Sequence, residues 1–192
     1  MKGGFKIEKT RLNKGDVLFL YTDGIEESTR KFRDQNFNVV KCEEIAGVKD
    51  GVHANHKVGS ESEQMENDRI QAIIEAVLNK QKYRLEKFHN PVPGEVLEFD
   101  FADCQGTTEE VILALCSVEK VFRFYKPQDA GEKDTVRVDR RIDDFLKKRF
   151  NRYDYYCGTK ADDLADNIYL YYTALREDEQ LDDLTLVAAK IS

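Results

Sequence analysis

The sequence has no tryptophan, only three prolines, and no apolar run near the roughly 20 residues that a membrane-spanning helix needs. Its four cysteines lack the CxxC spacing of zinc and redox sites, and we expect them to be reduced and mostly buried. No signal-peptide pattern opens the chain. The four cysteines are Cys42, Cys104, Cys116 and Cys157. Together, these features predict a cytoplasmic protein without a membrane span.

Basic residues do not predominate either. The 192 residues carry a net charge of −7, so a concentrated basic surface for nucleic acid is not expected. Hydrophobic residues make up 41% of the chain, which is enough for a real core, and the length fits one domain over residues 1–192. No phosphate-cradling GxxxxGK[ST] loop and no GxSxG nucleophile motif occurs. A serine or cysteine nucleophile is therefore a weak option.

The stretch from Leu12 to Glu27 organises the chain. Lys14-Gly15-Asp16 has turn chemistry, and residues 17–21 form a continuous apolar run that predicts a strand with both faces covered. Asp23 and Gly24 follow where this strand stops, and a short helix is predicted over residues 25–32.

The last segment has the opposite order, with Asp182 and Asp183 first and a strand after them. If the two strands are antiparallel neighbours, Asp23 and this acidic pair meet at one edge of the sheet. Carboxylates gathered in this way favour a hard divalent cation. The alternative is that these aspartates are only turn residues at strand ends. Because adjacent strand residues point to opposite faces, we expect only one of Asp182 and Asp183 to be a ligand.

Three substantial helices are predicted between these ends. Residues 68–88 carry an apolar stripe at helical spacing, with Asp68 and Gln71 resembling a capping box. Thr107 and Glu110 form a second such box before another helix, and residues 138–150 form a third with a basic outer face. Residues 96–101 alternate as a strand. The prediction is an α+β fold with a mostly antiparallel sheet flanked by helices.

Two further segments contain residues that could take part in a functional site. Residues 49–67 read as a loop, in which His53 and His56 are either a metal pair or incidental, and which could also act as a flap over a substrate. Residues 169–190 read as a hairpin that presents Asp182 at or near its tip. Arg176, the cation nearest to the acidic pair in sequence, either holds substrate phosphate or pairs with a neighbouring acid.

The strings GDVLFLYTDGIEES and DDLTLVAAKI, in this order, resemble the C-terminal half of the metal-dependent protein serine/threonine phosphatases. The similarity is to the bacterial branch of stage II sporulation protein E and the sigma-factor-regulating phosphatases. It implies a hydrolase with a two-metal site of Mn²⁺ or Mg²⁺ that activates water to attack phosphoserine or phosphothreonine. By motif match, Asp23 and Asp182 are ligands, Asp183 is the reserve candidate, and Gly24 belongs to the metal-site backbone.

The resemblance covers only the two ends of the chain. The bridging Asp and the glycine-rich elements of the family's first half do not occur here, so we expect the back half of a catalytic domain, weakly active or inactive alone. Residues 38–165 would be an inserted helical subdomain in the family's two-sheet sandwich. The partners implied are an upstream sensor domain and a phosphorylated anti-sigma-factor antagonist as substrate.

The competing hypothesis is a non-catalytic interaction module with vestigial carboxylates. In that case the inserted helices, and above all the basic face of residues 138–150, would bind a regulator or a second copy of the chain as a homodimer. A solvated basic face is the simpler interpretation of the same residues. Binding of Mn²⁺ that depends on Asp23 and Asp182 distinguishes the enzyme from the module.

Overall fold

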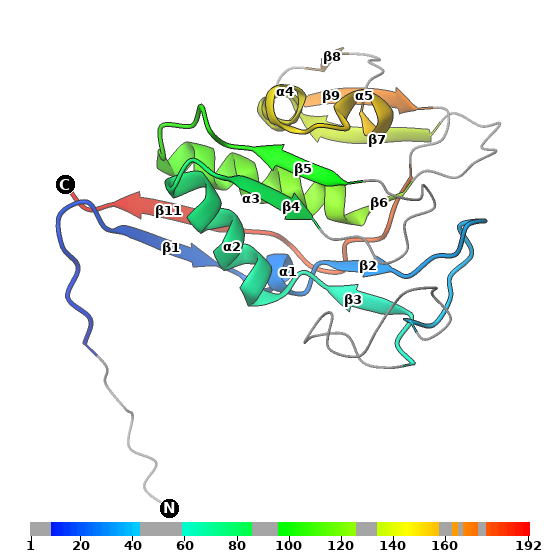
Figure 1. Cartoon of the computed structure of the whole chain (residues 1–192), viewed down its shortest axis with the longest axis horizontal. Helices are drawn as coiled ribbons and strands as arrows, with labels where there is room; N and C mark the ends of the chain where they lie inside the picture. The colour runs from blue at the N-terminus through cyan, green and yellow to red at the C-terminus, as the bar shows by residue number, and fades with distance from the viewer. Residues whose placement is uncertain are drawn as a thin grey trace, which may run out of the picture.

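The computed structural model describes residues 9–42, 59–85, 96–125, 134–157, 163–164, 167–172 and 176–192. Over these residues the fold is α+β, with small antiparallel sheets and helices packed between them (Figure 1). The helices are α1 (Asp23–Glu26), α2 (Glu66–Leu78), α3 (Thr108–Arg123), α4 (Arg140–Arg149) and α5 (Tyr153–Tyr156). The α+β class and the antiparallel pairing are as predicted, while the two-sheet sandwich and the insertion at residues 38–165 stay predictions.

Among the described residues, the strands pair in five small sheets, all of them antiparallel. The order within each sheet is β1–β11, β2–β3, β4–β5, β6–β10 and β7–β9–β8. Their bounds are β1 Val17–Tyr21, β2 Thr29–Lys31, β3 Ser62–Gln64, β4 Lys82–Leu85, β5 Leu97–Asp100, β6 Phe124–Tyr125, β7 Asp134–Asp139, β8 Asp163–Leu164, β9 Asn167–Tyr172, β10 Arg176–Glu177 and β11 Leu186–Lys190.

Helix α3 is the centre of the fold. Its start is the predicted capping box: the Thr107 hydroxyl accepts from the Glu110 backbone N–H at 3.2 Å, and the Glu110 carboxylate accepts from Thr107 N–H at 3.0 Å. The helix contacts α2, α4, β2 and β11. Its buried stripe belongs to the same hydrophobic core as Ile25 next to the acidic turn and Phe99 of β5. Two helices of the predicted insertion, α2 and α3, therefore share a core with the segment that follows β1.

The predicted helix over residues 68–88 is wrong in its second half. Helix α2 begins at Glu66 and ends at Leu78, Lys80 adopts a positive φ of 56°, and the chain turns into β4. Tyr83 then pairs with Phe99 of β5, so a partner strand distant in sequence overrides the local helical pattern. The N-cap residue is Met65 without a side-chain cap, so the predicted box at Asp68 is also wrong. Residues 86–95 lie outside the described part.

Three other expectations need correction. The helix predicted over residues 25–32 ends at Glu26, and β2 follows it. The loop predicted at residues 49–67 contains β3, which pairs with β2, while His53 and His56 lie outside the described residues. The hairpin predicted over residues 169–190 does not form, because β9 pairs with β7 and β8, whereas β11 pairs with β1.

The β1–β11 pair is covered on one face only. Phe19, Tyr21 and Leu186 pack against the core, as does Leu184 just before β11. On the opposite face, Leu18, Leu20 and Val187 are 39%, 56% and 52% exposed. The prediction that both faces of β1 are covered is therefore wrong: its continuous apolar run places leucines on an outer face over which, in the described part of the chain, nothing packs.

The cysteines agree with the sequence prediction. All four are free thiols, three of them are buried, and Cys116 is half-buried. Burial raises the pKa of Cys116 to about 12 and also raises the pKa of Cys157, so both stay protonated at neutral pH. Within the residues described, no helix is both long enough and apolar enough to cross a bilayer.

Candidate functional site: an acidic edge where the first and last strands meet

Strands β1 and β11 lie side by side and run in opposite directions, as predicted (Figure 1). Tyr21 pairs with Leu186, and one residue further on the Thr22 backbone N–H donates to the carbonyl of Thr185 at 3.1 Å. The end of β1 is thus beside the start of β11. The turns that carry Asp23 and the Asp182-Asp183 pair therefore come together at one edge of the sheet. We call these three aspartates the acidic edge.

Thr22 joins the two turns directly. Its hydroxyl donates to the Asp183 carbonyl oxygen at 3.1 Å and accepts from the Thr185 N–H, also at 3.1 Å. Thr22 is the N-cap residue of α1, but its side chain makes no cap hydrogen bond there. A hydroxyl that would usually satisfy its own helix end is used instead to bridge to the last segment of the chain.

Gly24 allows the two turns to approach this closely. A Cβ at this position would lie 2.3 Å from the carbonyl oxygen and 2.9 Å from the carbonyl carbon of Asp183, which is far inside contact distance. The glycine is needed for space, since only a hydrogen atom fits against that backbone. Gly24 therefore sets how closely the turn of Asp23 approaches the backbone of Asp183.

The carboxylates of the acidic edge are exposed to solvent. One Asp182 oxygen accepts from the Asp183 N–H at 2.7 Å, and the Asp182 carbonyl accepts from the Gln180 side chain at 2.9 Å. Residues 180–183 line an open hollow of about 440 Å³. In the described part of the chain, none of the three carboxylates forms a salt bridge. Their oxygens are available to a hard cation.

The acidic edge is incomplete as a metal centre. Over the residues described, no group of three or more His, Cys, Asp or Glu side chains is placed to hold a metal ion. Asp182 and Asp183 precede β11 in an irregular segment, so the strand alternation on which the prediction of a single ligand was based does not apply to them. Near the edge, partial burial and the Glu26 carboxylate raise the pKa of Tyr21, whose hydroxyl donates to Asn67 of α2.

Arg176, the predicted phosphate ligand, lies in the short strand β10, where it pairs with Tyr125 of β6. Its neighbour Glu177 binds Lys120 of α3 at 3.0 Å. The position of Arg176 is thus set by the pairing of β10 with β6, and the hairpin that was predicted to contain Arg176 does not form. A role in holding phosphate stays a prediction.

Sequence reasoning missed a group of buried charges behind the acidic edge. Asp178 lies in a run of charged residues in the sequence but is only 6% exposed, and Arg33 of the segment after β2 binds it. Glu119 and Arg123 of α3 are 4% and 2% exposed and pair with each other. The only signal in the sequence is the i,i+4 spacing of that pair, which is usual for exposed helix faces as well.

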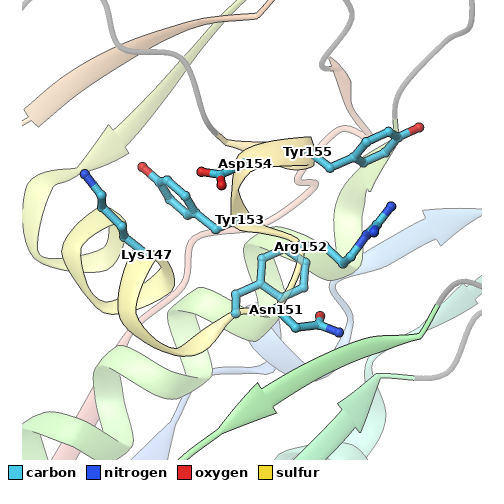
Figure 2. A pocket seen from close by; sticks show the side chains of 7 residues that line it. Lys147, Asn151, Arg152, Tyr153, Asp154 and Tyr155 are labelled. Atoms are coloured by element: carbon cyan, nitrogen blue, oxygen red, sulfur yellow. The ribbon is translucent and has the colours of Figure 1, made fainter.

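A second hollow of about 540 Å³ lies between α4 and α5 (Figure 2). Lys147 and Tyr153 line one side of it, while Arg152 and Tyr155 point to the other. The Tyr153 hydroxyl donates to buried Asp143 at 2.7 Å, and the Asn151 side chain bonds the backbone of Glu98 and Val96. The Tyr153 bond holds α5 against α4, and the Asn151 bonds hold the segment before α5 against the start of β5. The mixed charges around the hollow do not select one class of ligand.

No family model, curated protein or solved structure matches this chain. The phosphatase resemblance therefore rests on two sequence motifs and on the geometry of the acidic edge.

Proposed function

We propose that this chain is the C-terminal portion of a metal-dependent phosphoprotein phosphatase and that its acidic edge supplies ligands to the metal site. The observation that carries the proposal is the antiparallel pairing of β1 with β11, which brings the two resemblance motifs into contact at Gly24 and the Asp183 carbonyl. These motifs lie at opposite ends of the sequence. Their meeting at one end of the strand pair is what the resemblance predicts.

The donor set fits a hard divalent cation such as Mn²⁺ or Mg²⁺. It consists of carboxylates, the ligands that both ions prefer, and they lie exposed beside an open hollow. Asp23 and Asp182 are the proposed ligands, with Asp183 as the reserve. When bound, a pair of such ions lowers the pKa of a bridging water and neutralises charge on the phosphoryl oxygens.

The chain's own residues have two roles in this proposal. Thr22 and Gly24 hold the two turns at a fixed separation, because a hydroxyl bridge and a close backbone contact leave little freedom. Asp23 and Asp182 are proposed to present negative charge toward a common space. The remaining ligands are proposed to come from the front half of the catalytic domain. A phosphorylated anti-sigma-factor antagonist is the proposed substrate, an upstream sensor the proposed regulator, and Arg176 a proposed phosphate contact.

Titration with Mn²⁺ tests the ligand assignment. The wild-type chain is expected to bind Mn²⁺, and Asp23→Asn and Asp182→Asn are each expected to weaken binding at least about tenfold, since each removes a charged ligand. Glu179→Gln is the matched control, because it removes one exposed negative charge in the same segment without removing a proposed ligand. Equal weakening by all three variants would show general electrostatic attraction instead of coordination.

Hydrolysis of a generic phosphoester tests the enzyme class. We expect little or no activity from this chain alone and a gain when it is combined with the front half of the proposed catalytic domain. Full activity of this chain alone would contradict the proposed division of the site. No activity in the longer protein, together with no binding of Mn²⁺, would contradict the phosphatase proposal.

One observation favours the alternative of an interaction module. Leu18, Leu20 and Val187 form an exposed apolar face on the β1–β11 pair, a feature typical of surfaces that contact another protein. A regulator or a second copy of the chain is the proposed partner in this case. Self-association that Leu20→Lys abolishes, in a chain that does not bind Mn²⁺, would favour the module over the enzyme.

A further inference from the structure

A buried ionic layer links the two acid-bearing turns from inside the fold. It consists of Ser28, Arg33, Glu119, Arg123 and Asp178, all of them buried. Ser28 follows Asp23 after the single short helix α1, and Asp178 precedes Asp182 in the segment after β10. The two ends of the layer are thus attached to the two segments that the acidic edge brings together.

Asp178 anchors the segment that leads to Asp182. Its carboxylate accepts from the Lys31 backbone N–H at 2.9 Å and from the Arg33 guanidinium. Its backbone N–H donates to the Arg123 carbonyl at 3.0 Å, and its carbonyl accepts from the Arg123 side chain at 2.8 Å. Every polar group of Asp178 is therefore fixed by β2, by the residues after it, or by the end of α3.

Glu119 connects this anchor to the other turn. The carboxylate binds the Arg123 guanidinium and also accepts from the Ser28 hydroxyl at 2.5 Å. The Ser28 carbonyl in turn accepts from the Met65 N–H at 2.8 Å. Burial alone would lower the pKa of Arg123, but Glu119 raises it above the ordinary value, so the guanidinium stays charged.

The path from Ser28 through Glu119 and Arg123 to Asp178 is continuous and buried. Charges are expensive to bury, and an apolar arrangement of the same volume would often be at least as stable. What such a path adds is a fixed geometry, because each group bonds its neighbours in one arrangement only.

We propose that Glu119 and Arg123 are positioning residues that set the separation between the turn of Asp23 and the turn of Asp182. The inference rests on the proposed function for its role in metal binding. Neither residue touches the acidic edge itself. They act through Ser28 on one side and Asp178 on the other.

A second buried group provides a matched control. Glu63 of β3 binds Arg30 of β2 at 2.6 Å and Arg69 of α2 at 2.8 Å, and all three side chains are buried. This triad joins β2, β3 and α2, whereas Glu119 and Arg123 join the end of α3 to the segment that leads to Asp182. Its loss should lower overall stability without separating the two turns.

The experiment compares Glu119→Gln with Glu63→Gln. Both variants are expected to melt at lower temperature. Only Glu119→Gln is expected to increase amide hydrogen exchange in residues 180–185, measured without metal. It should also weaken Mn²⁺ binding, by no more than about tenfold, because it acts through Asp178 and a direct outer-shell contact is worth about 10- to 100-fold. Ser28→Ala, which removes one hydroxyl link and keeps the ion pair, should shift both readouts in the same direction by less. It also provides a test if Glu119→Gln does not fold.

The outcomes separate this inference from the proposed function. Equal exchange in residues 180–185 for the two glutamine variants, after matching for stability, would overturn the positioning role. Wild-type protein that binds no Mn²⁺, but shows faster exchange only in Glu119→Gln and Ser28→Ala, would reject the metal site while supporting the positioning of the turns.

Discussion

The acidic edge and the ionic layer use similar side chains in opposite ways. At the edge, three carboxylates lie in water with no salt bridge in the described part of the chain, on turns whose backbones are in close contact. In the layer, each buried carboxylate has a guanidinium partner. A buried charge must be paired to persist, whereas exposed charges can be left without partners at small cost.

The difference indicates that one region stabilises the fold and that the other is suited to bind a cation. The layer contributes to the folded state and fixes its geometry, while the edge adds little stability and keeps its oxygens available. If this division is right, substitutions in the two regions must separate stability from cation binding.

The largest effect is expected from Asp178→Ala. The substitution leaves Arg33 buried without its carboxylate partner and opens the contact to Lys31. Breaking a buried pair on one side typically costs about 3–5 kcal/mol. Urea unfolding of the variant measures this loss, and a change below about 1 kcal/mol would show that water reaches the site, as it does at surface pairs.

The next effect is expected from Glu63→Gln, and it should depend on pH. Burial alone would raise the pKa of Glu63, but Arg30 and Arg69 hold it below the ordinary value. A lowered pKa in the folded state means that the carboxylate contributes stability above the ordinary Glu range of about 4.3, and that this contribution disappears as the pH falls through the folded pKa.

Unfolding of wild type and Glu63→Gln at several pH values measures this contribution. The difference in free energy of unfolding should be large at pH 7, a few kcal/mol by the usual cost of breaking a buried pair, and should shrink below about pH 4. A difference that is the same at all pH values would mean that the carboxylate contributes through shape and hydrogen bonds and not through charge.

The structural features that the sequence predicted correctly depend on local motifs or on a repeated pattern of residues. Thr107 and Glu110 define the start of α3 because a capping box depends on residues three apart. The alternation at Leu97 and Phe99 identified β5 for the same kind of reason. The pairing of β1 with β11 was predicted from the order of acid and strand in each segment, since antiparallel neighbours place opposite ends together.

The parts that were missed depend on partners distant in sequence. Strand β4 has a helical pattern, and only its pairing with β5 explains why Tyr83 is in a strand. Asp178 lies in a run of charged residues, and nothing local distinguishes it from an exposed acid. Its burial follows from Arg33 and Arg123, which reach it from elsewhere in the chain.

A smaller loss is expected from Gly24→Ala. The added methyl group would lie against the Asp183 carbonyl, and because this is backbone, the two turns must move apart to accept it. Overpacking of this kind typically costs about 1–3 kcal/mol. Thermal melting measures the loss, and Mn²⁺ titration of the same variant should show weaker binding, since the acidic turns are displaced. Gly15→Ala provides the contrast, because it strains a positive φ of 96° without meeting any atom.

The smallest effect on stability is expected from Asp182→Asn, which removes a charge from the acidic edge. Its carboxylate forms no salt bridge in the described part of the chain and lies beside Asp183, so the neutral side chain relieves repulsion and keeps the hydrogen bond to the Asp183 N–H. Without metal, the melting temperature should stay the same or rise slightly. With Mn²⁺ in excess, the wild type should gain stability by mass action while the variant gains less, so the order of the two reverses. A variant that melts well below the wild type without metal would show instead that Asp182 is a structural turn residue. The acidic edge would then stabilise the fold as the ionic layer does, and the two regions would not differ in the way proposed.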